Sequence, residues 1–267
     1  MITVKSVWDV INSFAPFDTA ESWDNSGLLI GNFLQPVTRI LIALDVNEDV
    51  VHEAISQKYD LIISHHPFIF TGIKQLHSDE RISRMAMSLI KSGISVISAH
   101  TNIDRCFEHG INKFVADKLS LSRVSALGEY GVYGYFEKKK ALDVLINELK
   151  MLFKINVIKV AAYKQMDADH PKWIEKVAFS SGASMDFLNQ ALAENVDVYI
   201  TSDVKYHEAQ QVIGYNCTLI DVGHYESESI YLPYFRDIII EKLIQIKNDD
   251  PIYVHVSSDE KPIFSYL

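Results

Sequence analysis

Two stretches of the chain decide its fold: Arg39 to His66, RILIALDVNEDVVHEAISQKYDLIISHH, and Lys176 to Asp203, KVAFSSGASMDFLNQALAENVDVYITSD. They align without a gap at a constant offset of 137 positions, the difference between 39 and 176. Each opens with a short apolar run and closes with another, and the segment between them alternates polar and apolar residues. This pattern predicts strand, helix, strand. Short apolar runs of this kind are typical of a parallel sheet covered on both faces, so the chain is expected to be an α/β protein.

A second pair of stretches repeats in the same order. AHTNID (99–104) and GHYESE (223–228) each follow an apolar run and contain a histidine four residues before a carboxylate. A periodic α/β chain can produce one such match by chance, but two in the same order favour a duplicated half. We therefore expect two similar α/β lobes with mainly parallel sheets, related by approximate twofold symmetry. Residues 1–124 are expected to form the first lobe, and residues 125–267 a middle segment and the second lobe.

Hydrophobic spacing predicts further elements outside these stretches. A helix is expected over residues 4–14, and another over residues 79–92, where Gly93 would end it. The middle segment is expected to contain a strand at 132–136, a helix at 141–153 and a strand at 156–160.

Composition indicates a globular protein and does not favour nucleic-acid binding, although a local basic patch could still form in three dimensions. A chain of 267 residues with 48% hydrophobic residues can bury a large core. The formal net charge of −10 and the pI near 5.4 would repel a phosphate backbone. The one basic run, Lys138 to Lys140, is expected at a helix start that faces solvent.

Cysteine usage and hydropathy place the protein in the cytoplasm. Cys106 and Cys217 are too few for a disulfide framework or a thiolate metal site. Asp9 and Asn12 interrupt the first apolar stretch, which therefore lacks the core of a signal peptide. No apolar run approaches the roughly 20 residues needed to cross a bilayer, so no membrane partner is expected.

The adjacent histidines His65 and His66 stand at the end of a predicted strand. Successive side chains on a strand point to opposite faces, so both can turn toward one site only where the strand breaks. Pro67 supports a break at this point. Two imidazoles together suggest a metal or phosphate site, although surface or capping histidines would give the same pattern.

The two His-x3-carboxylate pairs, His100 with Asp104 and His224 with Glu228, have the spacing that places two side chains on one face of a helical turn. As an isolated pattern this is more often an exposed helix pair than a metal site. Both pairs follow predicted strands, and this position favours a metal site, because open α/β sheets bind ligands beyond the carboxyl ends of their strands.

A third polar cluster follows the second predicted strand of the repeat. Asp203, Lys205 and His207 lie within five positions of one another. They could be a helix cap with two solvated neighbours, or they could contact substrate or support metal ligands. Neither a Gly-rich phosphate loop nor a nucleophile elbow is present in the sequence.

At these residues the chain resembles a known family, the dinuclear-metal-centre proteins called GTP cyclohydrolase type 2-like or Ngg-interacting-factor-three-like. The matching stretches are WDNSGLLIG (23–31), SHHP (64–67), AHTNID (99–104), DVKYHEAQ (203–210) and GHYESE (223–228). They occur in the family's order and extend to about residue 230. Ser202 and the turn 182–184 depart from positions that are often glycine in the family.

The resemblance implies a site and an assembly. It implies two lobes that form a toroidal hexamer. The duplication separately leads us to expect the metal site in a cleft between the two halves. The resemblance also implies that the metal ligands are His65, His66, Asp104, His224 and Glu228. Two divalent ions per chain are then expected, and zinc, iron and manganese all suit mixed His and carboxylate ligands.

The preferred function is a metal-dependent hydrolase that acts on a nucleotide or a related small molecule. Two metal ions would activate a water molecule and polarise the group under attack. His100 or His207 could move protons, and Lys205 could face a phosphate. The alternative is a non-enzymatic metal-binding or regulatory protein, whose site would be closed by protein ligands.

Overall fold

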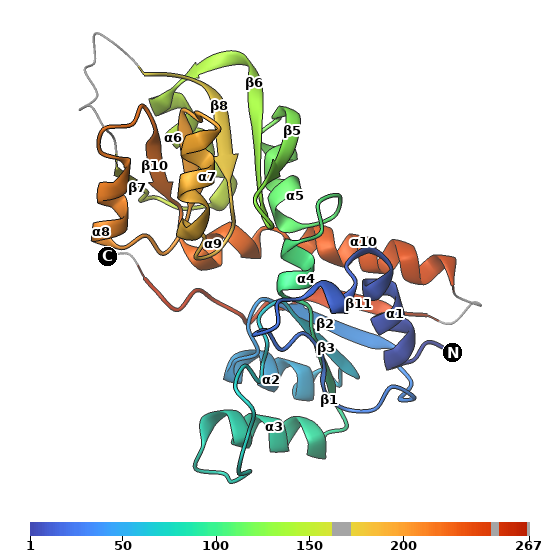
Figure 1. The fold of residues 1–267 in the computed structure, drawn as a ribbon. Coiled ribbons are helices and arrows are strands. Elements are labelled where there is room, and N and C mark those ends of the chain that lie inside the picture. Colours follow the sequence, from blue (N-terminus) through green and yellow to red (C-terminus); the bar gives the residue numbers. More distant parts are fainter. Residues whose placement is uncertain (162–171, 247–250, 266–267) are drawn as a thin grey trace. The chain divides into compact units, whose positions relative to one another are not determined.

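The two quoted stretches form the centres of two separate β-sheets in the computed structural model, which describes residues 1–161, 172–246 and 251–265. Each sheet belongs to its own compact unit (Figure 1). The first unit comprises Met1–Arg105 and Tyr231–Ile263, and the second contains Cys106–Ile230. The fold is therefore α/β, the class that the sequence predicts, and both sheets are mixed.

The first unit contains a five-stranded sheet in the order β1-β4-β3-β2-β11. Only β1 is antiparallel to its neighbour, so this sheet is mainly parallel, as predicted. Its elements are α1 (Val4–Phe14), the short helix η1 (Phe17–Thr19), β1 (Gly27–Ile30), β2 (Arg39–Ala43), α2 (Glu48–Ser56), β3 (Leu61–Ser64), α3 (Arg81–Lys91), β4 (Ser95–Ser98), α4 (Thr101–Asp104), α10 (Leu232–Gln245) and β11 (Tyr253–Val256).

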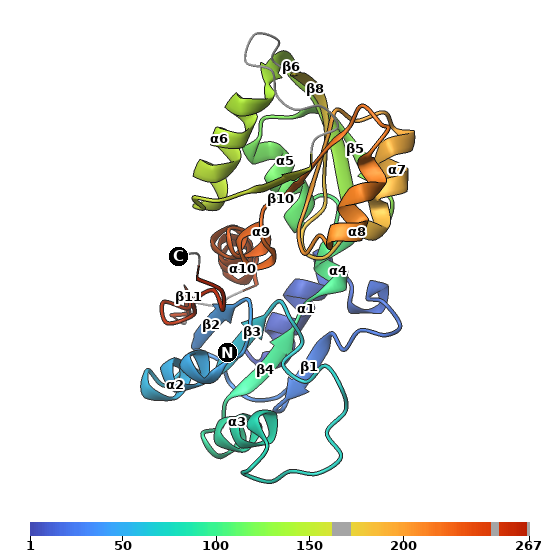
Figure 2. The same cartoon turned by 90° about the vertical axis from the view of Figure 1, so that its left-hand side faces the viewer.

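Helices cover both faces of this first sheet. Helices α2 and α3 lie on one face, and α1 and α10 lie on the other (Figures 1 and 2). Leu41, Ala43 and Ile62 pack against α2 and α3 in one apolar cluster, and all of β3 and β4 is buried. The apolar runs that predicted the strands therefore also form the core. Each fully buried aliphatic side chain contributes roughly 1.5–3 kcal/mol to folding stability. The expected helices over 4–14 and 79–92 are confirmed within two residues.

The second unit contains a six-stranded sheet in the order β5-β6-β8-β9-β10-β7. Only the pairs β8–β9 and β9–β10 are parallel, so the expectation of a mainly parallel sheet is wrong here. Its elements are α5 (Ile111–Lys118), β5 (Ser122–Leu127), β6 (Gly131–Ala141), α6 (Leu142–Phe153), β7 (Lys159–Ala161), β8 (Trp173–Phe179), the short helices η2 (Met185–Phe187) and η3 (Gln210–Val212), α7 (Leu188–Ala193), β9 (Val198–Thr201), α8 (Tyr206–Ala209), β10 (Thr218–Asp221) and α9 (His224–Ser229).

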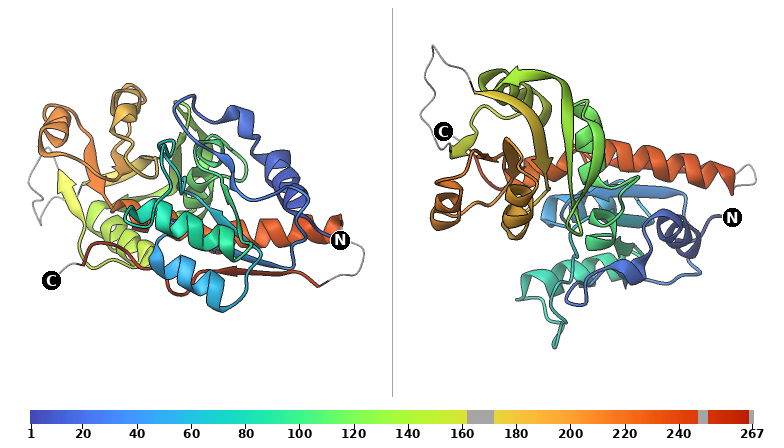
Figure 3. Two further views of the ribbon diagram at one scale, coloured as in Figure 1. Left: turned by 90° about the horizontal axis from the view of Figure 1, so that it is seen from below. Right: turned by 45° about the horizontal axis from the view of Figure 1, so that its top comes forward.

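This second sheet also has helices on both faces. Apolar residues of α5 and α6 pack on one face, around Val177 and Phe179, and residues of α7 pack on the other, around Ala178 and Tyr199. Figures 2 and 3 show these helices on either side of the strands. The alternation of neighbouring β8 residues between the two clusters is the period-2 geometry of a strand.

The middle segment departs from its prediction in detail. The expected strand at 132–136 is the start of the longer β6, and the helix at 141–153 is confirmed as α6. The basic run Lys138 to Lys140 ends β6 and does not begin a helix. Lys140 forms an ion pair with Glu148 of α6 at 2.7 Å, and Lys139 forms one with Glu175 of β8 at 3.1 Å. Two of the three lysines are therefore paired with acidic residues of neighbouring elements.

The repeat at offset 137 is visible in the backbone pairing. Ile40 pairs with Leu61 between β2 and β3, and Val177 pairs with Val198 between β8 and β9, so the two registers are identical. In both units a carboxylate just before the second strand of the repeat accepts hydrogen bonds from two backbone N–H groups at the start of the first strand. The donors are Thr38 and Arg39 for Asp60, and Glu175 and Lys176 for Asp197, all at 2.8 or 2.9 Å.

The second repeat is one residue out of register. Ser64 pairs with Ser98, and its equivalent Thr201 pairs with Asp221, so the offset at this strand is 123. His224 therefore corresponds to Thr101 and not to His100. The match of the two His-x3-carboxylate patterns is a sequence coincidence and not a structural equivalence. Among the described residues, no helix combines the length and the apolar character needed to cross a membrane.

Candidate metal centre

The carboxyl end of β3 carries the two adjacent histidines of the first unit. The backbone N–H groups of His65 and His66 donate to the carbonyls of Ala43 and Leu44, so pairing with the β2 side continues beyond Ser64. The Ser64 hydroxyl donates to the carbonyl oxygen of His66 at 2.8 Å and fixes the bend before the proline. His65 is buried, and His66 is half-buried.

Three histidines meet at this edge of the first sheet. His65, His66 and His100 each offer a ligand atom within 4.8 Å of the other two, so they could hold a metal ion. The Nε2 atom of His65 also lies 3.7 Å from Oδ1 of Asp104. His100 comes from the loop after β4, where it precedes α4 and is not part of the helix. The backbone N–H of Asp104 donates to the His100 carbonyl at 3.1 Å, so one turn joins the two residues, and the pairing of their side chains stays a prediction.

Each of these histidines uses its Nδ1 atom for a hydrogen bond within the protein. Nδ1 of His65 donates to the Ala99 carbonyl at 3.0 Å. Nδ1 of His66 donates to Asp45 at 2.9 Å, and Nδ1 of His100 donates to Asp24 at 3.0 Å. Such partners fix the ring orientation and the tautomer, so Nε2 is the ring nitrogen that can bind a metal ion or exchange a proton.

Asp24 is the most strongly held of these carboxylates. Its side chain is fully buried and accepts hydrogen bonds from the His100 ring, from the hydroxyls of Ser26 and Thr101, and from the N–H groups of Asn25 and Thr101. Burial raises the pKa of Asp24, but the hydrogen bonds from His100 and Thr101 outweigh it and hold this pKa well below its ordinary value. Asp24 is therefore a fixed negative charge behind His100.

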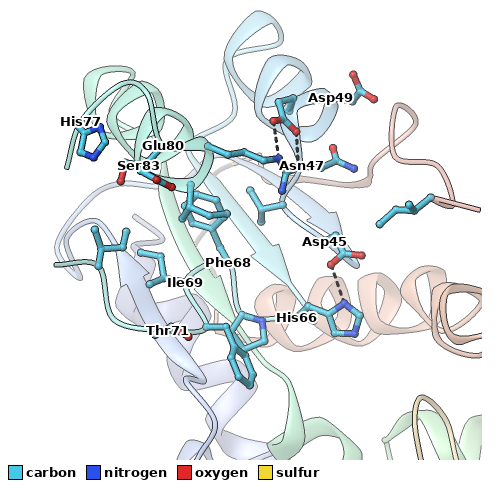
Figure 4. A pocket seen from close by; sticks show the side chains of 18 of the residues that line it. Asp45, Asn47, Asp49, His66, Phe68, Ile69, Thr71, His77, Glu80 and Ser83 are labelled. Atoms are coloured by element: carbon cyan, nitrogen blue, oxygen red, sulfur yellow. Dashed lines mark hydrogen bonds and ion pairs between the residues drawn. The ribbon is translucent and has the colours of Figure 1, made fainter. Parts of the chain in front are cut away.

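Asp45 is positioned from the far end of the chain. The carboxylate of Glu260 accepts hydrogen bonds from the N–H groups of Leu44 and Asp45 at 2.9 and 2.7 Å. Burial raises the pKa of Glu260 to about 7. Figure 4 shows Asp45 bonded to His66 at the edge of a cavity of about 1,030 Å³, which is also lined by Phe68, Phe70 and the first turns of α2 and α3.

The second unit carries its own pair of ligand candidates. His224 begins α9 and Glu228 lies one turn later, so their Nε2 and Oε2 atoms are 3.3 Å apart. This pair has the helical geometry that its spacing predicted. Nδ1 of His224 donates to Asp203 at 2.7 Å, which repeats the arrangement of His66 with Asp45. Asp203 adopts a left-handed backbone conformation with φ of 55°.

A glycine keeps space open against this pair. A Cβ atom at Gly182 would lie 2.6 Å from Oε1 of Glu228 and 3.4 Å from Nε2 of His224, and φ at Gly182 is +62°. The Gly182 carbonyl accepts from the hydroxyl of Ser202, and its N–H donates to Ser227 in α9. The turn is therefore fixed to the helix that carries both ligand candidates.

The donor set suits divalent transition metals. Imidazole nitrogens with a fixed Nδ1 partner and carboxylate oxygens are the ligands that zinc, iron and manganese share. Each unit supplies both kinds of ligand atom, and in the second unit Gly182 leaves room beside them. The residues present therefore fit a metal ion.

The remaining predicted site residues lie on exposed surfaces. Lys205 and His207 belong to the exposed segment around α8, where Lys205 pairs with Glu208 at 3.4 Å and His207 bonds with Gln210. Their catalytic role, like that of His100, stays a prediction. Sequence reasoning gave no role to Asp24 or Asp45. Asp24 stands in the quoted WDNSG motif, whereas Asp45 carries no local signal, because its partner His66 comes from another strand.

Comparisons with known proteins agree with the resemblance seen in the sequence. The model of the family described as Duf34/NIF3 (NGG1p interacting factor 3) matches residues 2–262. A Helicobacter pylori protein named GTP cyclohydrolase 1 type 2 is 32% identical over 251 residues, which cover 93% of this chain and 97% of its own. A Campylobacter jejuni protein named GTP cyclohydrolase 1 type 2 homolog is 27% identical over 99% of both chains.

Solved structures share the fold. A hypothetical protein from Staphylococcus aureus superposes with a TM-score of 0.89 at 25% identity and covers 99% of each chain. A Bacillus cereus protein related to NIF3 has the same TM-score at 21% identity, covering 100% of this chain and 99% of its own. At that identity the likeness concerns the fold alone.

Proposed function

The chain belongs to the Duf34/NIF3 family, and we propose that it is a dinuclear metal-dependent hydrolase that acts on a nucleotide or a related small molecule. The proposed ligands are His65, His66 and Asp104 from the first unit, with His224 and Glu228 from the second. The observation that carries the proposal is the set of hydrogen bonds made by the ligand histidines. In each of them Nδ1 donates to a carboxylate or a backbone carbonyl.

This arrangement supports a metal site over a cluster of surface histidines. Surface imidazoles need no buried acceptor, whereas ligand histidines almost always donate their second N–H to one. His65 and Glu228 are buried, and burial of a charge or an imidazole is costly unless a partner compensates. His65 lies 3.7 Å from Asp104 and Glu228 lies 3.3 Å from His224, so each buried group stands beside another ligand candidate, as in a metal site.

The chemistry follows from the kinds of group at the site. Two bound metal ions would supply Lewis acidity that activates water and polarises the group under attack. His100 would accept or donate a proton at Nε2, because the hydrogen bond from Nδ1 to Asp24 orients its ring. Asp45 and Asp203 would keep the His66 and His224 rings in place. The names of the relatives, GTP cyclohydrolase 1 type 2 and its homolog, support a guanine nucleotide as a first candidate substrate.

Metal content is the first test. Elemental analysis of purified, reconstituted protein should give close to two transition-metal ions per chain. His65→Ala and Glu228→Ala should lose metal without unfolding, while His52→Ala, at an exposed position of α2, should retain it. Wild-type protein that carries no metal after reconstitution would rule out the proposed centre.

Turnover is the second test, and it separates the hydrolase from a non-enzymatic metal-binding protein. Metal-loaded protein should hydrolyse at least one member of a panel of nucleotides and phosphoesters, and Glu228→Ala should abolish that activity. Full metal content without turnover of any panel member would favour a metal-binding or regulatory role. The family resemblance also leads us to propose a homohexamer, which sedimentation can test against the 30.4 kDa chain mass.

A further inference from the structure

Two aromatic side chains beside the histidine cluster are largely exposed to solvent. Trp23 exposes 57% of its surface and Phe70 exposes 55%. Their ring centroids lie 6.1 Å apart, with the planes tilted by 44°. The Trp23 ring also lies 6.1 Å from the ring of His100, which belongs to the cluster with His65 and His66. The aromatic pair therefore borders the candidate metal centre.

The backbone segments that carry the two rings are fixed to each other. Trp23 directly precedes Asp24, which is anchored to His100 and Thr101. The side-chain amide of Asn25 donates to the carbonyl of Ile69, the residue before Phe70, at 2.5 Å. Because both segments are already held in place, a ring that binds to this pair orders little additional chain. The exposed pair is preorganised.

The adjoining cavity connects the pair with the metal-ligand candidates. Phe70 and His66 both line the cavity of about 1,030 Å³, a volume at the upper end of small-molecule sites. The lining includes four carboxylates, Asp45, Glu48, Asp49 and Glu80, against the three cations Lys74, Arg81 and Lys261. This near balance of charge does not select an anion. The exposed aromatic faces are the more selective feature, since they attract planar rings.

We propose that Trp23 and Phe70 form a stacking subsite that binds the planar heteroaromatic ring of the substrate, a nucleobase being the chemical class it fits. This inference deepens the proposed function and rests on it, because it takes the reacting part of the substrate to lie at the metal centre. Trp23 is then a specificity-determining residue, while the histidines and carboxylates hold the metal.

Two probes that differ only in the base test the subsite. GMP and ribose 5-phosphate share the sugar and the phosphate, and calorimetric titration into the metal-loaded protein measures both affinities. Base stacking on an aromatic side chain corresponds to about 5- to 150-fold in affinity. Wild-type protein should therefore prefer GMP by this factor. Trp23→Ala should remove the preference without changing ribose 5-phosphate binding, and Trp23→Phe should keep most of it.

Trp173→Ala is the matched control, because Trp173 has the same 57% exposure but lies in β8 of the second unit. It should change neither affinity, and all variants should keep the wild-type metal content. Equal or absent binding of both probes to wild-type protein overturns the subsite, as does an unchanged preference in Trp23→Ala. A change of oligomeric mass in Trp23→Ala would identify the pair as a subunit contact and also overturn it. A Trp23-dependent preference in protein that hydrolyses nothing would support the subsite and count against the hydrolase.

Discussion

At the scale of single residues, the candidate site is built from pairs in which one acidic or carbonyl group holds one imidazole. The pairs His66 with Asp45 and His224 with Asp203 are separated by 21 positions in each case, and each joins the segments that follow two neighbouring strands. The carboxylates leave Nε2 of each ring as the ligand atom. A carboxylate in this position generally strengthens the bond between an imidazole and a metal ion.

Asp45→Asn tests this role. A neutral amide accepts the hydrogen bond from Nδ1 of His66 more weakly than a carboxylate does. Metal affinity should therefore fall by about 10- to 100-fold. Competition with a chromophoric chelator measures the affinity. Asp45 is only half-buried, so the folded state should tolerate the change. Asp49→Asn, at an exposed position in the first turn of α2, serves as the control and should bind metal as wild type does. Equal affinities in the two variants would remove Asp45 from the site.

Gly182→Ala tests the space beside Glu228. The added Cβ would approach Oε1 of Glu228 to 2.6 Å, so the carboxylate must move and metal binding in the second unit should be lost. Positive φ also strains alanine at this position. Gly214→Ala separates the two effects, because φ is +97° there and nothing lies within 4 Å of the new Cβ. If both variants lose metal equally, backbone strain and not crowding is responsible.

At the scale of elements, the duplicated strand–helix–strand unit is held by equivalent bonds. The strand registers match, and so do the turns that follow the helices α2 and α7. Lys58 and Asn195 stand at these turns, and both adopt left-handed conformations, with φ of 56° and 52°. Each reverses the chain toward the next strand. Asp60 and Asp197 then tie the start of that strand to its neighbour.

Replacing these two carboxylates should destabilise both units. A hydrogen bond to a charged group contributes about 1.5–3 kcal/mol net of its exchange with water, and the amide oxygen of asparagine still accepts weakly. Asp60→Asn and Asp197→Asn should therefore each cost about 1–3 kcal/mol of unfolding free energy. Asp60 should cost more, because it also accepts from the Thr38 hydroxyl. Urea unfolding measures the change. Asp117→Asn, an exposed residue paired with Lys113 within one helix, should cost less than about 0.5 kcal/mol. A loss of that small size at Asp60 would contradict the structural role.

At the scale of the whole molecule, each unit has its own sheet with its own apolar core, so neither core depends on metal. The ligand candidates lie beyond the ends of strands and on two short helices, α4 and α9, outside those cores. Metal binding should therefore stabilise the molecule without being needed for its folding.

Removal of metal by a chelator should leave a folded protein with a lower Tm. Metal at 100 times its Kd adds about 2.7 kcal/mol, which corresponds to several degrees in a chain of this size. Differential scanning calorimetry with and without metal measures the shift. In Glu228→Ala the shift should be reduced, because one carboxylate ligand is gone. A shift as large as that of wild type would exclude Glu228 as a ligand.

The sequence by itself determined the α/β class, the repeat at offset 137 and the family, because strand periodicity and the quoted motifs are local properties of the chain. It also identified His224 and Glu228 as a pair, since one helical turn sets their separation. Tertiary structure decided the rest. Strand order made the second sheet mixed, and strand register showed that His100 and His224 are not equivalent. Asp45 holds His66, and Glu260 holds Asp45, through contacts across 21 and 215 positions that no local spacing encodes.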